Sequence, residues 1–260
     1  MKRIEEVSPK VTPELYSKIY EFWSNNVNSE KIYGSLVTNS ERGSEQYFQE
    51  LESQRYRSHR HLLPWIHSMK PGKTVLEIGC GIGLDSYQLV KHGMKLTAID
   101  LTNIAIEIAS SRFKASNIEG NFFIGDATSL QFDDNSFDYV YSFGVLHHVQ
   151  DTEKAIIEVY RVLKQGGIAK VMLYNLHSLN ELIHRLTLTP FEDKNELCPV
   201  VRRFSKKEAS RLFYKFNRID IKKDFVYGEG YGRLFKYTPL WLYKKLSSIA
   251  GWHLMITAYK

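Results

Sequence analysis

The chain has 260 residues and a formal net charge of +6; 43% of its residues are hydrophobic and 25% are charged. This composition suits a soluble protein built as one large α/β domain, alone or with a lid. No stretch approaches the ~20 apolar residues of a membrane span, and the N-terminal residues lack the apolar core of a signal peptide. Cys80 and Cys198 are the two cysteines, with neither a disulfide framework nor metal-ligand spacing. We therefore expect a cytoplasmic protein with no membrane span and no metal site.

Positive charge is concentrated near the C-terminus. Residues 201–260 contain fourteen Lys or Arg and four Asp or Glu, a balance of +10, so the other residues sum to −4. Such asymmetry can indicate an anionic partner such as nucleic acid. Because the basic residues form no compact run or arginine-rich arm, a solvated surface with a few counter-ions is the simpler interpretation.

Residues 1–70 precede the first predicted strand and are expected to form an N-terminal helical cap. Aromatic residues at helical spacing predict a helix over 13–23. Ser44 is the expected N-cap of a second helix that runs to about Tyr56, and 57–69 reads as a third. The aromatic side chains of this cap either close over a ligand or pack the cap onto the rest of the chain.

From Lys73 onward strands and helices alternate, which predicts a doubly wound parallel sheet. The predicted strands are 74–78, 95–100, 121–127, 137–143 and 168–174, with helices at 84–90, 104–114 and 152–163. The pattern changes after Asn175: a helix at 179–186 is followed by an irregular stretch at 187–204 and a helix from a capping box at Ser205. Two late strands, 218–227 and 252–259, flank a further helix that begins at Pro239.

A glycine-rich loop follows the first predicted strand, in the run TVLEIGCGIG. Gly79, Gly81 and Gly83 lack a Cβ, so a ligand can approach the backbone closely, and the loop leads into a helix N-terminus with free N–H groups. The spacing is G-x-G-x-G, whereas the dinucleotide fingerprint is G-x-G-x-x-G. Glu77 stands two residues before the first glycine. Taken alone, the loop is compatible with a cofactor site or with a plain tight turn.

The other predicted strands also end in polar residues, and ligands in open α/β sheets bind beyond the carboxyl ends of the strands. Asp100 lies 21 residues after Gly79 and suits either a ribose-binding carboxylate or a helix cap. Asp126, in a Gly-Asp-Ala turn, suits either an adenine amino group or a surface turn. Ser142 to His148 follow at the end of the fourth strand.

These motifs, in this order, resemble the class I S-adenosylmethionine-dependent methyltransferases from Lys73 to Tyr174, and more loosely to the C-terminus. The resemblance implies a Rossmann-like, doubly wound seven-stranded sheet whose last strand is antiparallel. It implies a methyltransferase domain over 71–260 with a substrate-side insertion at about 176–250. The implied cofactor is S-adenosyl-L-methionine, and the product is S-adenosyl-L-homocysteine.

The resemblance also assigns cofactor-binding residues. The amino acid part is assigned to Glu77, Gly79, Cys80, Gly81 and Gly83, and the ribose to Asp100 and Leu101. The adenine is assigned to Asp126 and Ala127, and the region below the sulfonium to Ser142 and Phe143. A NAD-dependent dehydrogenase would need the later third glycine and gives the Gly-Asp-Ala turn no role. An aminopropyl transferase would need an acidic pocket, and the sequence shows no such cluster.

A methyl transfer from a sulfonium mainly requires alignment of nucleophile, methyl group and sulfur. A general base helps when the nucleophile is a hydroxyl or a protonated amine. His147 and His148 follow the fourth strand, and because consecutive side chains tend to diverge, we expect one of them to face the substrate and choose His147. The other interpretation of His147 is a structural hydrogen-bonding role. A cap aromatic such as Trp23, Tyr47 or Tyr56 could lie near the sulfonium.

The acceptor depends on residues 1–70 and 176–250, which are rich in Tyr, Phe and Trp. This composition favours a closed pocket, so we expect a small organic molecule methylated on oxygen or nitrogen. An RNA methyltransferase that uses the basic C-terminal face is the second hypothesis, and a cofactor-binding protein without turnover is the third.

Overall fold

The computed structural model describes residues 12–27, 38–188 and 198–260. Parts of the predicted cap (1–11 and 28–37) and of the predicted insertion (189–197) lie outside the described residues. The strands are β1 Thr74–Ile78, β2 Lys95–Asp100, β3 Asn121–Ile124, β4 Phe137–Phe143, β5 Leu163–Asn175, β6 Arg203–Phe204, β7 Arg218–Asp224 and β8 His253–Tyr259. The helices are α1 Pro13–Asn25, α3 Glu45–Ser58, α4 Leu62–His67, α5 Leu84–Lys91, α6 Asn103–Ala115, α7 Thr152–Val162, α8 Leu179–Thr187, α9 Lys206–Leu212, α10 Arg233–Tyr237 and α11 Leu240–Ala250.

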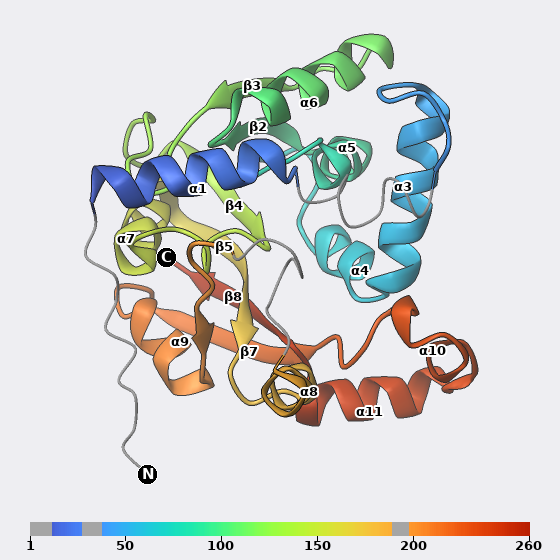
Figure 1. The fold of residues 1–260 in the computed structure, drawn as a ribbon. Coiled ribbons are helices and arrows are strands. Elements are labelled where there is room, and N and C mark those ends of the chain that lie inside the picture. The colour runs from blue at the N-terminus through green and yellow to red at the C-terminus, as the bar shows by residue number, and fades with distance from the viewer. Residues whose placement is uncertain (1–11, 28–37, 189–197) are drawn as a thin grey trace.

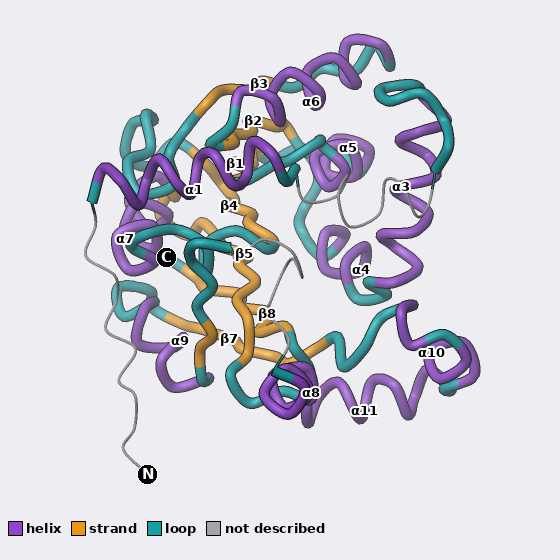
Figure 2. Tube along the Cα trace, viewed as in Figure 1, coloured by secondary structure: helices purple, strands orange, loops and turns teal. Residues whose placement is uncertain are grey.

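The strands form one sheet with helices packed around it (Figures 1 and 2). Its order is β3-β2-β1-β4-β5-β8-β7. The pairs from β3 to β5 are parallel, and β8 is antiparallel to both β5 and β7. The predicted α/β class and the seven-strand path with an antiparallel last strand are confirmed. An eighth strand, β6, pairs with Tyr174 and Asn175 at the end of β5; at two residues, it is too short to leave a periodic signal in the sequence.

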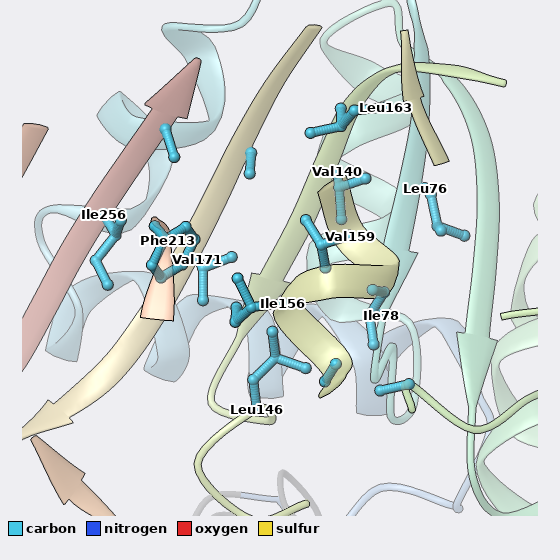
Figure 3. Packing of buried hydrophobic residues seen from close by; sticks show 14 of the residues in the cluster. Leu76, Ile78, Val140, Leu146, Ile156, Val159, Leu163, Val171, Phe213 and Ile256 are labelled. Atoms are coloured by element: carbon cyan, nitrogen blue, oxygen red, sulfur yellow. The ribbon is translucent and has the colours of Figure 1, made fainter. Parts of the chain in front are cut away.

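The core lies on both faces of β1, as the apolar run of that strand predicts. Leu76 and Ile78 join the main buried cluster, where Ile156 and Val159 of α7 pack toward Val140 of β4 (Figure 3). Val75 points to the opposite face, into a second cluster with residues of α4 and α5. Because side chains pack on both faces of β1, the position of this strand is fixed, and the loop that follows it is held at the edge of the sheet.

The predicted N-terminal helices are present, with one boundary wrong. The Ser44 Oγ accepts a hydrogen bond from the Tyr47 N–H at 3.2 Å and caps α3, as predicted. The third helix is shorter than the predicted 57–69: α3 runs to Ser58, and α4 begins only at Leu62. Pro64 explains the break, because proline has no N–H for an interior helical hydrogen bond and is tolerated only in a first turn.

Among the helices of the described residues, none is both long enough and apolar enough to cross a membrane.

Candidate functional site

A cavity of about 420 Å³ lies at the carboxyl ends of β1, β2 and β4. The loops after these strands, the turn after β3, and helices α1 and α3 provide its walls. Nine of the eleven residues assigned to the cofactor line it: Glu77, Gly79, Cys80, Gly81, Asp100, Leu101, Asp126, Ala127 and Phe143. Gly83, Ser142 and His147 do not. The sheet thus brings together at one site most of the residues that the sequence placed at successive strand ends.

The glycine loop needs glycine at Gly79 and Gly81 for different reasons. Both have positive φ, 77° and 52°, where side chains are disfavoured. A Cβ on Gly79 would lie 2.2 Å from the Val145 Cγ2, so this glycine permits packing against the loop after β4. A Cβ on Gly81 would meet no protein atom within 4 Å. Gly81 therefore borders the open cavity, and a side chain there would fill ligand space.

Asp100 ends β2 with its carboxylate held toward the loop. It accepts hydrogen bonds from the N–H of Gly81 at 2.9 Å and from the N–H and Oγ1 of Thr102, each at 3.0 Å. Burial raises the pKa of Asp100 above its ordinary value, while the bonds from Thr102 and Gly81 oppose this rise. The carboxylate therefore binds its own turn and also lines the cavity, whereas the N-cap of α6 is Thr102 and not Asp100.

Glu77 lies on the floor of the cavity and is almost completely buried. Its Oε2 accepts a hydrogen bond from the Ser86 hydroxyl at 2.5 Å. Burial, with the nearby Asp85 carboxylate, raises the pKa of Glu77 well above its ordinary value. A buried carboxyl of this kind would be stabilised by a cationic ligand group such as an ammonium.

Two of the assigned residues, Ser142 and Gly83, do not line the cavity. The Ser142 hydroxyl donates to the Ile78 carbonyl at 3.0 Å and joins β4 to β1. Gly83 has a positive φ of 78° and precedes the first residue of α5. Asp126 does line the cavity, and its Oδ1 also accepts from the N–H and Oγ1 of Thr128, at 2.7 and 2.8 Å.

The histidine pair is arranged in the opposite way from our prediction. His147 is completely buried, outside the cavity wall, with its ring centroid 3.7 Å from that of Tyr174. Burial, with His148 nearby, lowers the pKa of His147 well below its ordinary value. His148 lines the cavity instead. The structure differs from the sequence-based choice of His147 because the turn after β4 directs its ring into the core, a direction set by packing and not by strand alternation.

His148 is held in one orientation. Its Nδ1 lies 2.8 Å from the Val200 carbonyl oxygen, which can only accept, so Nδ1 carries the proton. In the neutral ring, Nε2 then has the lone pair. The Trp23 ring of α1 meets the His148 ring edge to face, with centroids 5.0 Å apart.

Two N-terminal helices contribute to the cavity wall, α1 and, through Arg55, α3. Tyr16, Ile19 and Trp23 of α1 form part of its wall, and α1 runs across the sheet in Figure 1. Of the aromatic residues suggested for the sulfonium, Trp23 lines the cavity. Tyr47 packs instead in a separate apolar cluster with Leu51 and Phe48.

Sequence reasoning missed a buried ionic network in the cavity wall, where Arg55 and Asp85 both line the cavity. Arg55 of α3 donates from Nε and Nη2 to the two carboxylate oxygens of Asp85, at 2.8 and 2.6 Å. The hydroxyls of Tyr56 and Tyr141 also donate to Asp85, each at 2.8 Å. Arg55, with Tyr56 and Tyr141, outweighs burial and lowers the pKa of Asp85. The sequence does indicate that Asp85, in the first turn of a helix, interacts favourably with the helix dipole. No local pattern indicates its partner Arg55, which lies thirty residues earlier.

Comparison with known proteins places residues 76–171 in a family described as "Methyltransferase domain". Phosphoethanolamine N-methyltransferase 2 of Caenorhabditis elegans is 40% identical over 109 residues, which are 40% of this chain and 24% of that protein. Sterol 24-C-methyltransferase erg6 of Schizosaccharomyces pombe is 28% identical over 159 residues, 60% of this chain and 38% of that protein. The chain thus spans well under half the length of these relatives.

A structure from Thermotoga maritima, described as a SAM-dependent methyltransferase and possible histamine N-methyltransferase, shares the fold. Its TM-score is 0.62 at 20% identity, over 93% of this chain and 99% of that one. The fold, the matched family domain and the ordered strand-end residues agree. Residues 76–171 therefore form a methyltransferase domain, on a fold of the class I type whose cofactor is S-adenosylmethionine.

Proposed function

We propose that this protein transfers a methyl group from S-adenosylmethionine to an oxygen or nitrogen of a small organic acceptor, by in-line displacement. One observation carries the proposal: a single cavity joins the strand-end residues assigned to the cofactor with aromatic and aliphatic side chains of the cap. A site walled by Tyr16, Ile19 and Trp23 of a covering helix suits a small, largely apolar acceptor better than an extended polymer.

The residues present fit the cofactor. Gly81 leaves its Cβ position open to the cavity, and we assign this loop, with Glu77, to the amino acid part of the cofactor. Asp100 is assigned to the ribose and Asp126 with Ala127 to the adenine, while Phe143 borders the region of the sulfonium. When bound, S-adenosylmethionine supplies a methyl group already activated on a sulfonium.

We assign the same roles to the parts of the chain as the sequence suggested: residues 71–260 as the methyltransferase domain and 1–70 as its cap. The contacts support a fixed position of the cap on the methyltransferase domain, because Arg55 of α3 forms a bidentate ion pair with Asp85 of α5. Such a pair has strong geometric preference, so α3 is held in one position against the glycine-loop helix.

His148 is the candidate to take the proton that an oxygen or nitrogen nucleophile loses. It lines the cavity, and its Nδ1–H bond to Val200 leaves Nε2 as the basic atom. Substitution of a positioned general base typically costs about 10²–10⁴-fold in rate. The two relatives differ in the atom that is methylated, since one is named for a nitrogen acceptor and the other for a sterol carbon.

Several basic residues of 201–260 are engaged within the protein, which weighs against the RNA hypothesis. Arg203 pairs with the buried Glu181 at 3.3 Å. The ammonium of Lys206 donates to the Ile221 carbonyl at 3.2 Å, and that of Lys260 to the Leu163 carbonyl at 2.6 Å. Cations held in this way are poorly placed to follow a phosphate backbone.

The test is a transfer assay with methyl-labelled cofactor, in which fractionated small metabolites and total RNA compete as acceptors. We expect label in a small molecule, on oxygen or nitrogen, and product inhibition by S-adenosylhomocysteine. Label on carbon, or in RNA, would contradict the proposal. For RNA, a track of six phosphate contacts would give a slope of log affinity against log salt near about −4. The K206E/K207E variant should leave small-molecule turnover nearly unchanged.

A further inference from the structure

The outer surface of α10 and α11 combines large apolar side chains with lysines and arginine. We call this surface the α10–α11 face and define it by the exposed apolar residues Leu234, Tyr237, Trp241 and Ile249 together with the exposed cations Arg233, Lys236, Lys244 and Lys245. Trp241 is 68% exposed and Tyr237 is 70% exposed. Scattered single apolar residues on a surface are ordinary, but a group of this size on two consecutive helices indicates an interaction site.

The periodicity of α11 explains how this face forms. Tyr243 and Ser247 are buried and four residues apart, so they mark the inner side of the helix. Trp241, Lys245 and Ile249 are also spaced by four residues and form an exposed stripe. The apolar residues of the outer side therefore alternate with cations whose aliphatic stems extend along the same surface.

The face is rigidly attached to the rest of the protein. Inside it, Phe235 and Tyr243 pack with Val226 and Tyr227, and the Tyr243 hydroxyl donates to the Tyr227 carbonyl at 3.0 Å. The guanidinium of Arg60 lies 4.0 Å from the centre of the Phe235 ring. Figure 1 shows α10 and α11 at the outer edge of the molecule, on the opposite side from α6 and β3.

Charge indicates which partner fits. Between Gly230 and Lys260 the sequence contains five basic residues, Arg233, Lys236, Lys244, Lys245 and Lys260, and no Asp or Glu. Lys260 is turned inward and bonded to backbone carbonyls, so the other four carry the charge of the face. A second copy of the chain in a symmetric dimer would bring identical cationic surfaces together. The partner must be anionic and must also accept leucine and isoleucine side chains.

We propose that the α10–α11 face docks on the surface of a bilayer that contains anionic phospholipid. Trp241 and Tyr237 suit the boundary between headgroups and acyl chains, and Leu234 and Ile249 suit the acyl region just below it. Lys244 and Lys245 reach the phosphates, since lysine can extend its ammonium to the headgroups while its stem stays in apolar surroundings. RNA fits less well, because the aliphatic residues would have no partner on a phosphate backbone. The inference concerns a surface outside the cavity and does not depend on methyl transfer.

Vesicle sedimentation tests the proposal with the full chain. The probes are phosphatidylcholine vesicles with and without phosphatidylglycerol, at low and high salt. We expect binding to the anionic vesicles that weakens as salt is raised, with a blue shift of Trp241 fluorescence that disappears in W241F. The K244Q/K245Q variant should lose affinity by about tenfold or more, and W241S should also bind weakly.

Matched controls lie at the two ends of α9. K206Q/K207Q removes two adjacent exposed lysines, and Y214S removes an aromatic residue that is 60% exposed; both should bind vesicles like the unmodified protein. The unfolding temperatures of all variants establish that they fold. Equal binding to neutral and anionic vesicles, or unchanged binding by folded K244Q/K245Q and W241S, would overturn the proposal. So would a solution dimer abolished by W241S, or RNA binding that needs the same two lysines.

Discussion

The Asp100 carboxylate accepts a hydrogen bond from the backbone N–H of Gly81, with 2.9 Å between Oδ2 and nitrogen. This bond ties the end of β2 to the centre of the loop that follows β1. The residue assigned to the ribose therefore also helps to hold the loop assigned to the amino acid part. Because one hydrogen bond joins these two groups, a change at either position should alter the affinity for the whole cofactor.

Replacement of Asp100 by alanine tests this relationship. D100A removes a buried acceptor from both the loop and the ribose site, so affinity for S-adenosylhomocysteine should fall by roughly 1–3 kcal/mol. Calorimetry measures this change, and D133A, which alters an exposed carboxylate outside the cavity wall, is the control. Unchanged affinity in D100A would assign Asp100 to the turn alone.

The glycine loop predicts two different kinds of failure. In G79A the new Cβ would collide with Val145, and forced overpacking typically costs about 1–3 kcal/mol of stability. In G81V the side chain would enter the open cavity, so the protein should fold, with a strain of about 2 kcal/mol from the positive φ, but should not bind S-adenosylhomocysteine.

Thermal unfolding and calorimetry on both variants separate the two effects. The G79A/V145A double variant should recover part of the lost stability, because the two colliding methyl groups of Val145 are gone, whereas its Cβ, 2.9 Å from the new Cβ, remains. A folded G81V protein with normal cofactor affinity would show that the loop is only a turn.

The two histidines should behave differently in catalysis. H148N keeps a hydrogen-bond donor but removes the basic nitrogen, so kcat should fall by about 10²–10⁴-fold while affinity for S-adenosylhomocysteine stays the same. H147F should alter stability more than kcat, because His147 is buried outside the cavity. The opposite pattern, with kcat lost in H147F and retained in H148N, would restore the sequence-based choice.

Buried histidines should make the protein sensitive to acid. Burial, followed by the nearby Arg55 cation, lowers the pKa of His59 from 6.5 to about 3. Between these two pH values the unfolded chain binds a proton that the folded protein does not, so stability is lost as pH falls from 6.5 toward 3. The loss for this single group should reach about 1.4 kcal/mol per pH unit.

Denaturant unfolding at pH 7 and pH 5 measures the effect. In H59F, the phenyl ring can still stack on Phe225, whose ring centroid lies 4.5 Å from that of His59, and the decrease in stability between the two pH values should be smaller by about 2 kcal/mol. H67F, at an exposed position, should leave the decrease unchanged. An equal decrease in H59F and in the unmodified protein would show that His59 does not resist protonation in the folded state.

The sequence by itself determined the sheet and the positions of its polar strand ends. Strands such as 74–78 have a local apolar pattern, and a parallel sheet places all their carboxyl ends at one edge. For this reason Glu77, Asp100 and Asp126 could be expected to meet, although a helix separates each of them from the next along the chain. The order of the motifs along the chain was sufficient to predict the site, because parallel strands bring the residues at their carboxyl ends close together in space.

The tertiary structure alone decided the remaining features. Arg55 and Asp85 are far apart in sequence and meet only because α3 packs beside α5. Whether His147 or His148 faces the cavity depends on how a turn packs against Tyr174 and Val200, which no local period records. The apolar outer side of α11 became visible only once Tyr243 was seen to be buried, because an amphipathic pattern with lysines among its apolar residues does not state which side faces solvent.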